Sequence, residues 1–242
     1  MTIRCYKTYR QPQAIGFDLD DTLYDNKPVL EQAESKLLCF LHENFPKSTQ
    51  YGFKDWLDLR NRVISLKPGL INDTSASRLA ALRLGLQTLG YDQEIAQDGA
   101  LAAFNEFIYW RNNVKISDDI HQLLRELKQY FTLFVISNGN ANITRLGIET
   151  YFEFALHPSE KVAMKPDNSL FELAEQRLQL PSHRISYVGD HPVSDVVGAN
   201  NAGWQSIWLN EKQSHLNHYK KPLQLPAIEL TSIEQLRVLI PQ

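Results

Sequence analysis

Apolar residues recur along this chain with two different spacings, and the spacing changes near residue 114. From Pro28 to about Asn113 the apolar positions repeat every three or four residues, which is the period of an amphipathic helix. The stretch "NDTSASRLAALRLGLQTLGY" has a capping residue at its start and a glycine near its end. The pattern therefore predicts a block of about four helices.

After residue 114, short apolar runs alternate with amphipathic segments. Ser117 is a predicted N-cap for the first of these segments, and a strand-like apolar run follows it. Strands that are buried on both faces read as continuous apolar runs, and helices that connect them indicate a parallel sheet. The predicted pairs of helix and strand are "SDDIHQLLRELKQY" with "FTLFVIS", "PDNSLFELAEQRLQL" with "RISYVGD", and "SDVVGANNAG" with "WQSIWLN".

The run "AIGFD" near the N-terminus belongs to the second pattern, although the helical block separates it from the other strands. The fold class is therefore α/β, with a doubly wound, mostly parallel, Rossmann-like sheet. Residues 1–25 and 114–242 are expected to form this core domain, and residues 26–113 an inserted helical cap domain. We expect the polar stretch "KQSHLNHYKKPLQLP" to be a surface loop before a last strand and helix in "AIELTSIEQLRVLI".

Composition narrows the functional classes. With 25 Lys and Arg against 28 Asp and Glu, the formal charge of −3 gives no general attraction to nucleic acid or to anionic membranes. No stretch approaches the ~20 apolar residues that a membrane span needs, and no signal peptide is evident. Cys5 and Cys39 fit neither a metal site nor a disulfide framework, which suits a cytoplasmic protein. The sequence does not indicate an oligomeric state.

Polar residues follow three of the predicted strands. In an open parallel sheet, ligands bind beyond the carboxyl ends of the strands, so we expect these residues to share one site. Lys165 is a fourth candidate, placed before a helix that Pro166 would begin; Lys161 is the alternative cation. The residues after the strands are Asp18 and Asp20, then Ser137, Asn138 and Gly139, and finally Asp190 with Asp195.

A phosphate ester gives each acidic group a chemical role. Asp18 is the predicted nucleophile, which would form an aspartyl-phosphate. Asp20 is placed to protonate the leaving alkoxide and later to take a proton from water. Clustered carboxylates repel each other and the incoming phosphate unless a divalent cation bridges them. We expect Mg2+ as the cofactor, with Asp18, Asp20 and Asp190 as its ligands.

The remaining groups are expected to hold the phosphate or to support the site. Ser137 offers a hydroxyl to the phosphoryl oxygens, together with the backbone N–H groups of Asn138 and Gly139. Lys165 would neutralise the nucleophile and the transferring group. Thr22 and Asp195 are expected to lie behind these groups, with Asp195 orienting Lys165 or a metal-bound water. Asp21 and Asp25 are read as turn or helix-capping residues.

Taken in order, these motifs resemble the haloacid dehalogenase-like phosphatases. They are "DLDDT" at 18–22, the serine of "VISNG", the lysine of "MKPD" and "GDHPVSD" at 189–195, and the helical insert is similar to the cap of the first subclass. The resemblance implies Mg2+-dependent hydrolysis of a phosphate monoester under a mobile cap. Within the family, "FDLDDTLYDN", "SNGNA" and the aromatic cap look most similar to bacterial phosphatases of flavin mononucleotide and of the phosphoribitylamino-pyrimidine of riboflavin synthesis. His191 stands where many relatives carry an acidic residue.

Three functions remain open at this point. The leading hypothesis is a phosphatase whose partner is a small-molecule phosphate ester. A dehalogenase would share Asp18, but releasing halide requires neither a general acid nor Mg2+, so Asp20 and Asp190 argue against it. The third hypothesis is a non-enzymatic module that senses phosphate. The cap aromatics Trp56, Phe104, Tyr109 and Trp110 would either fill a core or stack on a substrate ring.

Overall fold

A computed structural model describes residues 3–214 and 224–241. The chain divides into two compact units. The sheet unit contains Met1–Asp25, Lys115–Pro158 and Val162–Gln242, and the helical unit contains Asn26–Val114 and Ser159–Lys161.

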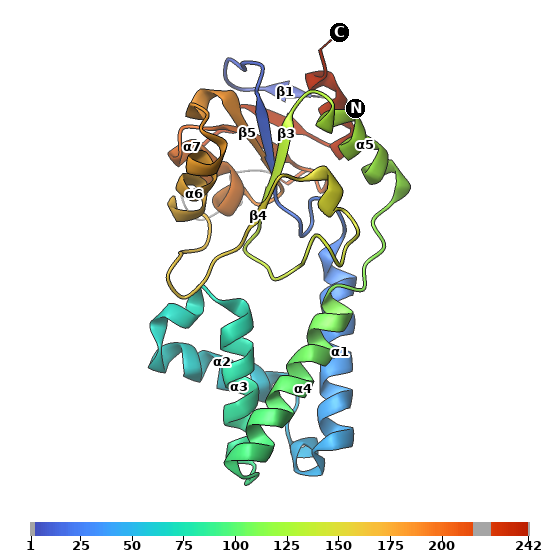
Figure 1. The fold of residues 1–242 in the computed structure, drawn as a ribbon, viewed down its shortest axis with the longest axis vertical. Coiled ribbons are helices and arrows are strands. Elements are labelled where there is room, and N and C mark those ends of the chain that lie inside the picture. The colour runs from blue at the N-terminus through green and yellow to red at the C-terminus, as the bar shows by residue number, and fades with distance from the viewer. Residues whose placement is uncertain (1–2, 215–223, 242) are drawn as a thin grey trace. The chain divides into compact units, whose positions relative to one another are not determined.

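The sheet unit is built on a seven-stranded sheet, which confirms the predicted fold class (Figure 1). The strand order is β1-β7-β6-β5-β2-β3-β4, and only the pairing of β1 with β7 is antiparallel. Ala14 pairs with both Thr132 and Ile185, so the central strands run in step. The strands are β1 Arg4–Cys5, β2 Ala14–Phe17, β3 Thr132–Ile136, β4 Ala155–Leu156, β5 Ile185–Gly189, β6 Gln205–Leu209 and β7 Ile228–Leu230.

Helices cover both faces of this sheet. Figure 1 shows α6 (Ser169–Leu178) and α7 (Gly198–Asn201) on one side and α5 (Asp118–Lys128) on the other. β2 and β5 are consequently buried along their whole length, as their continuous apolar sequences require. Shorter helical turns span Glu149–Tyr151, Ser182–Arg184, Pro192–Val197 and Ile233–Leu239.

The helical unit contains the four predicted helices. They are α1 Asn26–Asn44, α2 Phe53–Leu66, α3 Thr74–Thr88 and α4 Gln93–Arg111, with short turns at Pro46–Gln50 and Pro68–Ile71. Asp73 caps α3 by accepting a hydrogen bond from the Ala76 N–H at 2.8 Å. After α3, Gly90 has φ +80°, in the left-handed region that favours glycine.

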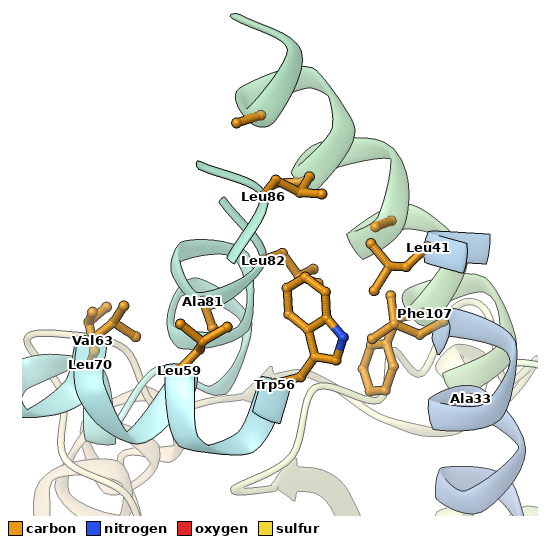
Figure 2. Close-up of a cluster of buried hydrophobic side chains, with 14 residues drawn as sticks. Ala33, Leu41, Trp56, Leu59, Val63, Leu70, Ala81, Leu82, Leu86 and Phe107 are labelled. Carbon is orange, nitrogen blue, oxygen red and sulfur yellow. The ribbon is translucent and has the colours of Figure 1, made fainter. Parts of the chain in front are cut away.

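The four helices enclose one apolar core (Figure 2). Trp56 of α2 lies in this core and is 8% exposed, so it is a packing residue of the helical unit. A Cβ on Gly85 would come within 2.2 Å of the Trp56 ring, which explains a glycine inside α3. Other buried members include Leu59, Leu82, Leu86 and Phe107.

Two local predictions differ from the structure, and the sequence pattern does not predict two of the strands. β1 and β4 are only two residues long, too short to produce an apolar pattern. The predicted C-terminal helix is a 3-10 helix, Ile233–Leu239. Pro166 does not begin α6, because a turn from Met164 to Asp167 comes first and the helix starts at Ser169.

The predicted surface loop lies mostly outside the described residues, at 215–223, and with it the pair Lys220 and Lys221. Among the helices that the structure does describe, none combines the length and the apolar character required to cross a membrane.

Candidate active site

Three neighbouring strands end at the same edge of the sheet. The register aligns Phe17 of β2 with Val135 of β3 and Val188 of β5. The residues that follow these strands therefore meet, as the sequence predicts for parallel strands. They line a pocket of about 200 Å³ together with Lys165. Its lining residues are Asp18, Asp20, Asp21, Ser137, Asn138, Gly139, Lys165, Asp190, His191, Ser194 and Asp195.

Lys165 is the central cation of this pocket and is only 2% exposed. Its ammonium donates to Asp18 Oδ1 at 2.9 Å and to Asp195 Oδ1 at 2.8 Å. It also lies 2.6 Å from the Tyr187 hydroxyl and 2.9 Å from the Ile136 carbonyl oxygen. Three N–H groups thus face four acceptors, which leaves no ammonium proton without a partner. The alternative cation, Lys161, is exposed and belongs to the helical unit.

Opposite charges decide the ionisation state of Lys165. Burial by itself would lower the pKa of its ammonium, but Asp18 and Asp195 outweigh burial and raise that pKa well above its usual range. Lys165 is consequently charged at neutral pH. A buried cation of this kind is tolerated only because its carboxylate partners are hydrogen-bonded to it.

Asp195 reaches Lys165 because Gly189 leaves room for it. A Cβ on Gly189 would lie 2.3 Å from the Asp195 carboxyl carbon. The other carboxylate oxygen of Asp195 accepts the His191 backbone N–H at 2.9 Å. Both oxygens are thus in use, which suits the predicted orienting role of Asp195 better than direct binding of a cation.

Asn138 holds the backbone of Lys165 from the neighbouring loop. Its side-chain NH₂ donates to the Lys165 carbonyl oxygen at 2.9 Å, and its Oδ1 accepts the Lys165 N–H at 2.8 Å. This pair of hydrogen bonds ties the loop after β3 to the loop before α6. Sequence reasoning gave Asn138 only a backbone role and did not anticipate this contact.

The loop after β3 is held in place by further contacts. Ser137 is fully buried, and its Oγ accepts the Gly139 N–H at 3.2 Å. The Gly139 carbonyl oxygen lies 3.0 Å from Nδ1 of His157. Burial lowers the pKa of His157, so the ring is neutral at pH 7 and Nδ1–H donates to this carbonyl.

Acidic side chains gather beside Lys165. Oxygen atoms of Asp18, Asp190 and Asp195 all lie within 4.8 Å of one another. Burial is the main cause that raises the pKa of Asp18 to about 7, and Asp195 and Asp20 add to it. Burial, followed by Asp195 and Asp18, likewise raises the pKa of Asp190 to about 7. Hard oxygen donors whose ionisation is suppressed by burial, and further by mutual repulsion, fit a divalent cation, which would stabilise their charged forms.

Asp20 and Asp21 complete the wall of the pocket. The Tyr24 hydroxyl donates to Asp20 Oδ1 at 2.5 Å, which fixes the orientation of that carboxylate. Asp21 has φ +56°, a left-handed conformation that is uncommon outside glycine and that places it in a tight turn.

Thr22 and His191 belong to the same sequence motifs as the aspartates of the pocket. Thr22 is 5% exposed and lines a neighbouring pocket of about 460 Å³, which shares Asp21 and Asp190 with the smaller one. His191 caps the helical turn Pro192–Val197, because its Nδ1 accepts the Val193 and Ser194 N–H groups.

Two supporting side chains were missed by sequence reasoning. The hydroxyl beside Lys165 belongs to Tyr187. The presence of a tyrosine within the apolar strand β5 is the only feature of the sequence that indicates it. His157 follows the two-residue strand β4, and nothing in its sequence neighbourhood indicates its contact with Gly139.

Comparison with known proteins places this arrangement in a family. The family model described as haloacid dehalogenase-like hydrolase matches residues 12–203. The Escherichia coli protein 5-amino-6-(5-phospho-D-ribitylamino)uracil phosphatase YigB is 32% identical over 238 residues, which cover 98% of this chain and 100% of that protein. Glyceraldehyde 3-phosphate phosphatase of Pyrococcus furiosus is 26% identical over 207 residues, covering 83% of this chain and 81% of the relative.

A solved structure shows the same fold over nearly the whole chain. The crystal structure of 2-haloacid dehalogenase from Pseudomonas syringae has a TM-score of 0.88 and 34% identity, and covers 94% of this chain and 97% of that one. Family membership thus rests on sequence and on structure together. This chain belongs to the haloacid dehalogenase-like hydrolases and is a phosphatase of that family.

Proposed function

We propose that this phosphatase hydrolyses a small phosphorylated metabolite with Mg2+ held by Asp18, Asp20 and Asp190. The observation that carries the proposal is the composition of one pocket, in which a buried lysine contacts the predicted nucleophile while further carboxylates face it. When bound, the cation would neutralise the carboxylates and polarise the phosphoryl oxygens.

Asp18 is suited to attack phosphorus. Its Oδ1 accepts the hydrogen bond of Lys165, and Oδ2 has no hydrogen bond within the part of the chain that the structure describes. Oδ2 would form the new bond to phosphorus while the bond from phosphorus to the ester oxygen breaks. Because burial raises the pKa of Asp18 to about 7, the charge of Lys165 is needed to keep the attacking carboxylate ionised.

Asp20 would manage the protons of both steps. As an acid it gives a proton to the leaving alkoxide; as a base it then takes one from the water that attacks the aspartyl-phosphate. That second attack breaks the bond between phosphorus and Asp18 and releases inorganic phosphate. The hydrogen bond from Tyr24 holds the Asp20 carboxylate in place for this work.

Ser137 and its loop would bind the phosphoryl oxygens. The buried Ser137 hydroxyl and the Asn138 N–H line the same pocket as the acidic side chains, and the Gly139 N–H, which was predicted to join them, donates to Ser137 Oγ and orients that hydroxyl. Since Asn138 is tied to Lys165, the donors on the two loops are preorganised as a unit.

For the substrate, we propose a phosphate ester of riboflavin synthesis or flavin mononucleotide. The support is the 32% identity to the Escherichia coli phosphatase over its full length, together with the motif similarity noted above. The dehalogenase named in the structural comparison favours a second candidate, cleavage of a haloacid at Asp18. Halide release in that reaction requires neither a general acid nor Mg2+, so Asp20 and Asp190 argue against it.

The test uses the purified full chain with p-nitrophenyl phosphate in Mg2+ or EDTA, and with 2-chloropropionate in a chloride assay. We expect Mg2+-dependent nitrophenol release and no chloride. Chloride release without phosphate release would overturn the proposal in favour of a dehalogenase, and neither product would favour a phosphate-sensing module. A panel of flavin mononucleotide, riboflavin-pathway phosphates, sugar phosphates and nucleotides then ranks substrates by kcat/KM.

A further inference from the structure

Arg60 is a half-buried cation in the helical unit that the catalytic pocket does not use. It lies on α2, one turn after the core residue Trp56, so the two share a face of the helix. The next arginine on this helix, Arg62, is exposed. Arg60 therefore extends along the packed face of α2, where a charge without a partner costs stability.

One hydrogen bond fixes the Arg60 side chain. Its Nε donates to the Ser77 hydroxyl oxygen at 3.0 Å, and that hydroxyl, which is fully buried, donates to the Thr74 carbonyl oxygen at 3.1 Å. Within the described residues, no carboxylate forms an ion pair with Arg60, and neither terminal nitrogen of its guanidinium donates a hydrogen bond. The two terminal nitrogens of the guanidinium, which together can bind one oxyanion, thus have no hydrogen-bond partner within the described residues.

The nearest carboxylate is already neutralised. Glu34 of α1 accepts two hydrogen bonds from Arg78 of α3, at 2.6 and 3.0 Å, and both side chains are largely buried. The Arg78 guanidinium also stacks on the Phe107 ring, with 3.7 Å from its central carbon to the ring centroid. This pair is complete in geometry and charge, so Glu34 is committed to Arg78.

Arg60, Arg78 and Glu34 together carry one net positive charge. Burial first, and repulsion from Arg78 second, lower the pKa of Arg60, while Glu34 offsets only part of this. The guanidinium still remains charged at neutral pH, because its ordinary value is far above 7. An anion at its free edge would remove the repulsion that these residues leave unbalanced.

We propose that Arg60 forms an oxyanion-binding site in the helical unit, in which its two terminal nitrogens bind a carboxylate, sulfate or phosphate group in a bidentate manner. Ser77 positions the guanidinium, and the Arg78–Glu34 pair prevents a local carboxylate from closing the site. The oxyanion is a separate small anion, which the helical unit binds by itself. The site shares no residue with the catalytic pocket.

Thermal unfolding of the full chain tests the site without relying on catalysis. Melting temperature is measured against sulfate and against malonate, with sodium chloride at matched ionic strength as the reference. The oxyanions should raise the melting temperature of wild type and of Arg62→Gln by the same amount. They should raise that of Arg60→Gln by less, because the binding at Arg60 is lost. Oxyanion binding in the catalytic pocket contributes equally to all three proteins. Equal responses of Arg60→Gln and Arg62→Gln would overturn the proposal.

Chemical modification of the wild type provides a second measurement that needs no variant. Phenylglyoxal labelling is followed at individual arginines by mass spectrometry of the digested protein. Sulfate or malonate at about tenfold above its dissociation constant should slow labelling of Arg60 by about tenfold, since only the unoccupied guanidinium reacts. Labelling of Arg62 should not change. If Arg60 and Arg62 label at anion-independent rates, the site does not exist.

Kinetics provide a control that the site is independent of catalysis. The steady-state rate of Arg60→Gln on p-nitrophenyl phosphate should equal that of wild type, because the site shares no residue with the catalytic pocket. An inactive wild type would refute the proposed function, but the unfolding and labelling results would still decide this site.

Discussion

Lys165 in the sheet unit and Arg60 in the helical unit are both cations withdrawn from water, but their surroundings leave charges of opposite sign. Around Lys165 lie Asp18, Asp195 and Asp190, three carboxylates for one ammonium. Around Arg60 lie Arg78 and Glu34, two guanidinium groups for one carboxylate. The first cluster is therefore negative and the second positive.

The two cations also differ in how fully they are bonded. Every N–H of Lys165 has an acceptor, whereas Arg60 uses one of five in the described residues. A buried charge that the fold does not compensate favours a ligand of the opposite charge. We therefore expect a cation to bind in the sheet unit and an oxyanion in the helical unit.

Replacing Asp18 with Asn should lower kcat/KM by more than about 1,000-fold, since an amide cannot serve as the nucleophile. The side-chain volume hardly changes, so the melting temperature should stay near that of wild type. Steady-state rates on p-nitrophenyl phosphate measure the effect, with the exposed residue change Asp119→Asn as the matched control. Activity in Asp18→Asn within tenfold of wild type would show that another group attacks phosphorus.

Lys165→Met should destabilise the protein strongly, whereas Arg60→Met should leave its stability nearly unchanged. Without Lys165, two buried carboxylates lose their cation, which should cost about 3–5 kcal/mol of unfolding free energy. Arg60 has no ion pair to lose, so Arg60→Met should change that free energy by less than about 1 kcal/mol. Urea denaturation in EDTA measures both. A similar loss in the two variants would mean that the guanidinium is as well compensated as the ammonium.

Sequence could predict the acidic pocket because its parts follow a topological rule. Continuous apolar strands predict a parallel sheet, and the carboxyl ends of such strands bring Asp18, Ser137 and Asp190 to one edge. Caps at Ser117 and Asp73 were also predictable, because capping depends on local hydrogen bonds.

The supporting contacts could not be predicted in this way. The Asn138 clamp and the Tyr187 hydroxyl depend on side-chain rotamers across segments far apart in sequence. Arg60 and Arg62 are two residues apart on one helix, and only the packing of α2 against α3 makes one half-buried and leaves the other exposed. Strand β1 pairs at the sheet edge through only two residues, which are too few to show a periodic spacing of apolar positions.

Stability of the metal-free protein should fall as pH rises towards about 8. The pKa values of Asp18 and Asp190, about 7 in the folded state, lie above their ordinary value of 3.8. The folded state therefore holds protons more tightly than the unfolded chain, so this contribution is complete below 3.8 and is lost as pH rises through about 7.

Added Mg2+ should reverse this slope, because the cation binds the ionised carboxylates and competes with their protons. Urea denaturation from about pH 4 to about pH 8, with Mg2+ or EDTA, measures both effects. Asp190→Asn is the control and should flatten the pH dependence in EDTA. A metal-free stability that increases steadily through pH 7 would show that these carboxyl groups are not held in their protonated form.

Tyr187→Phe should have a smaller effect than Lys165→Met, because the bonding of Lys165 is redundant. Removing the hydroxyl leaves three acceptors for three N–H groups, namely Asp18, Asp195 and the Ile136 carbonyl oxygen. The ring keeps its edge-to-face contact with Phe171, at 5.5 Å between centroids. The unfolding free energy should fall by less than about 3 kcal/mol, the net value of the two hydrogen bonds that the hydroxyl makes with Lys165 and with the Ile136 carbonyl oxygen. A loss as large as that of Lys165→Met would show that the hydroxyl, and not the two carboxylates, is the main partner that stabilises the buried Lys165.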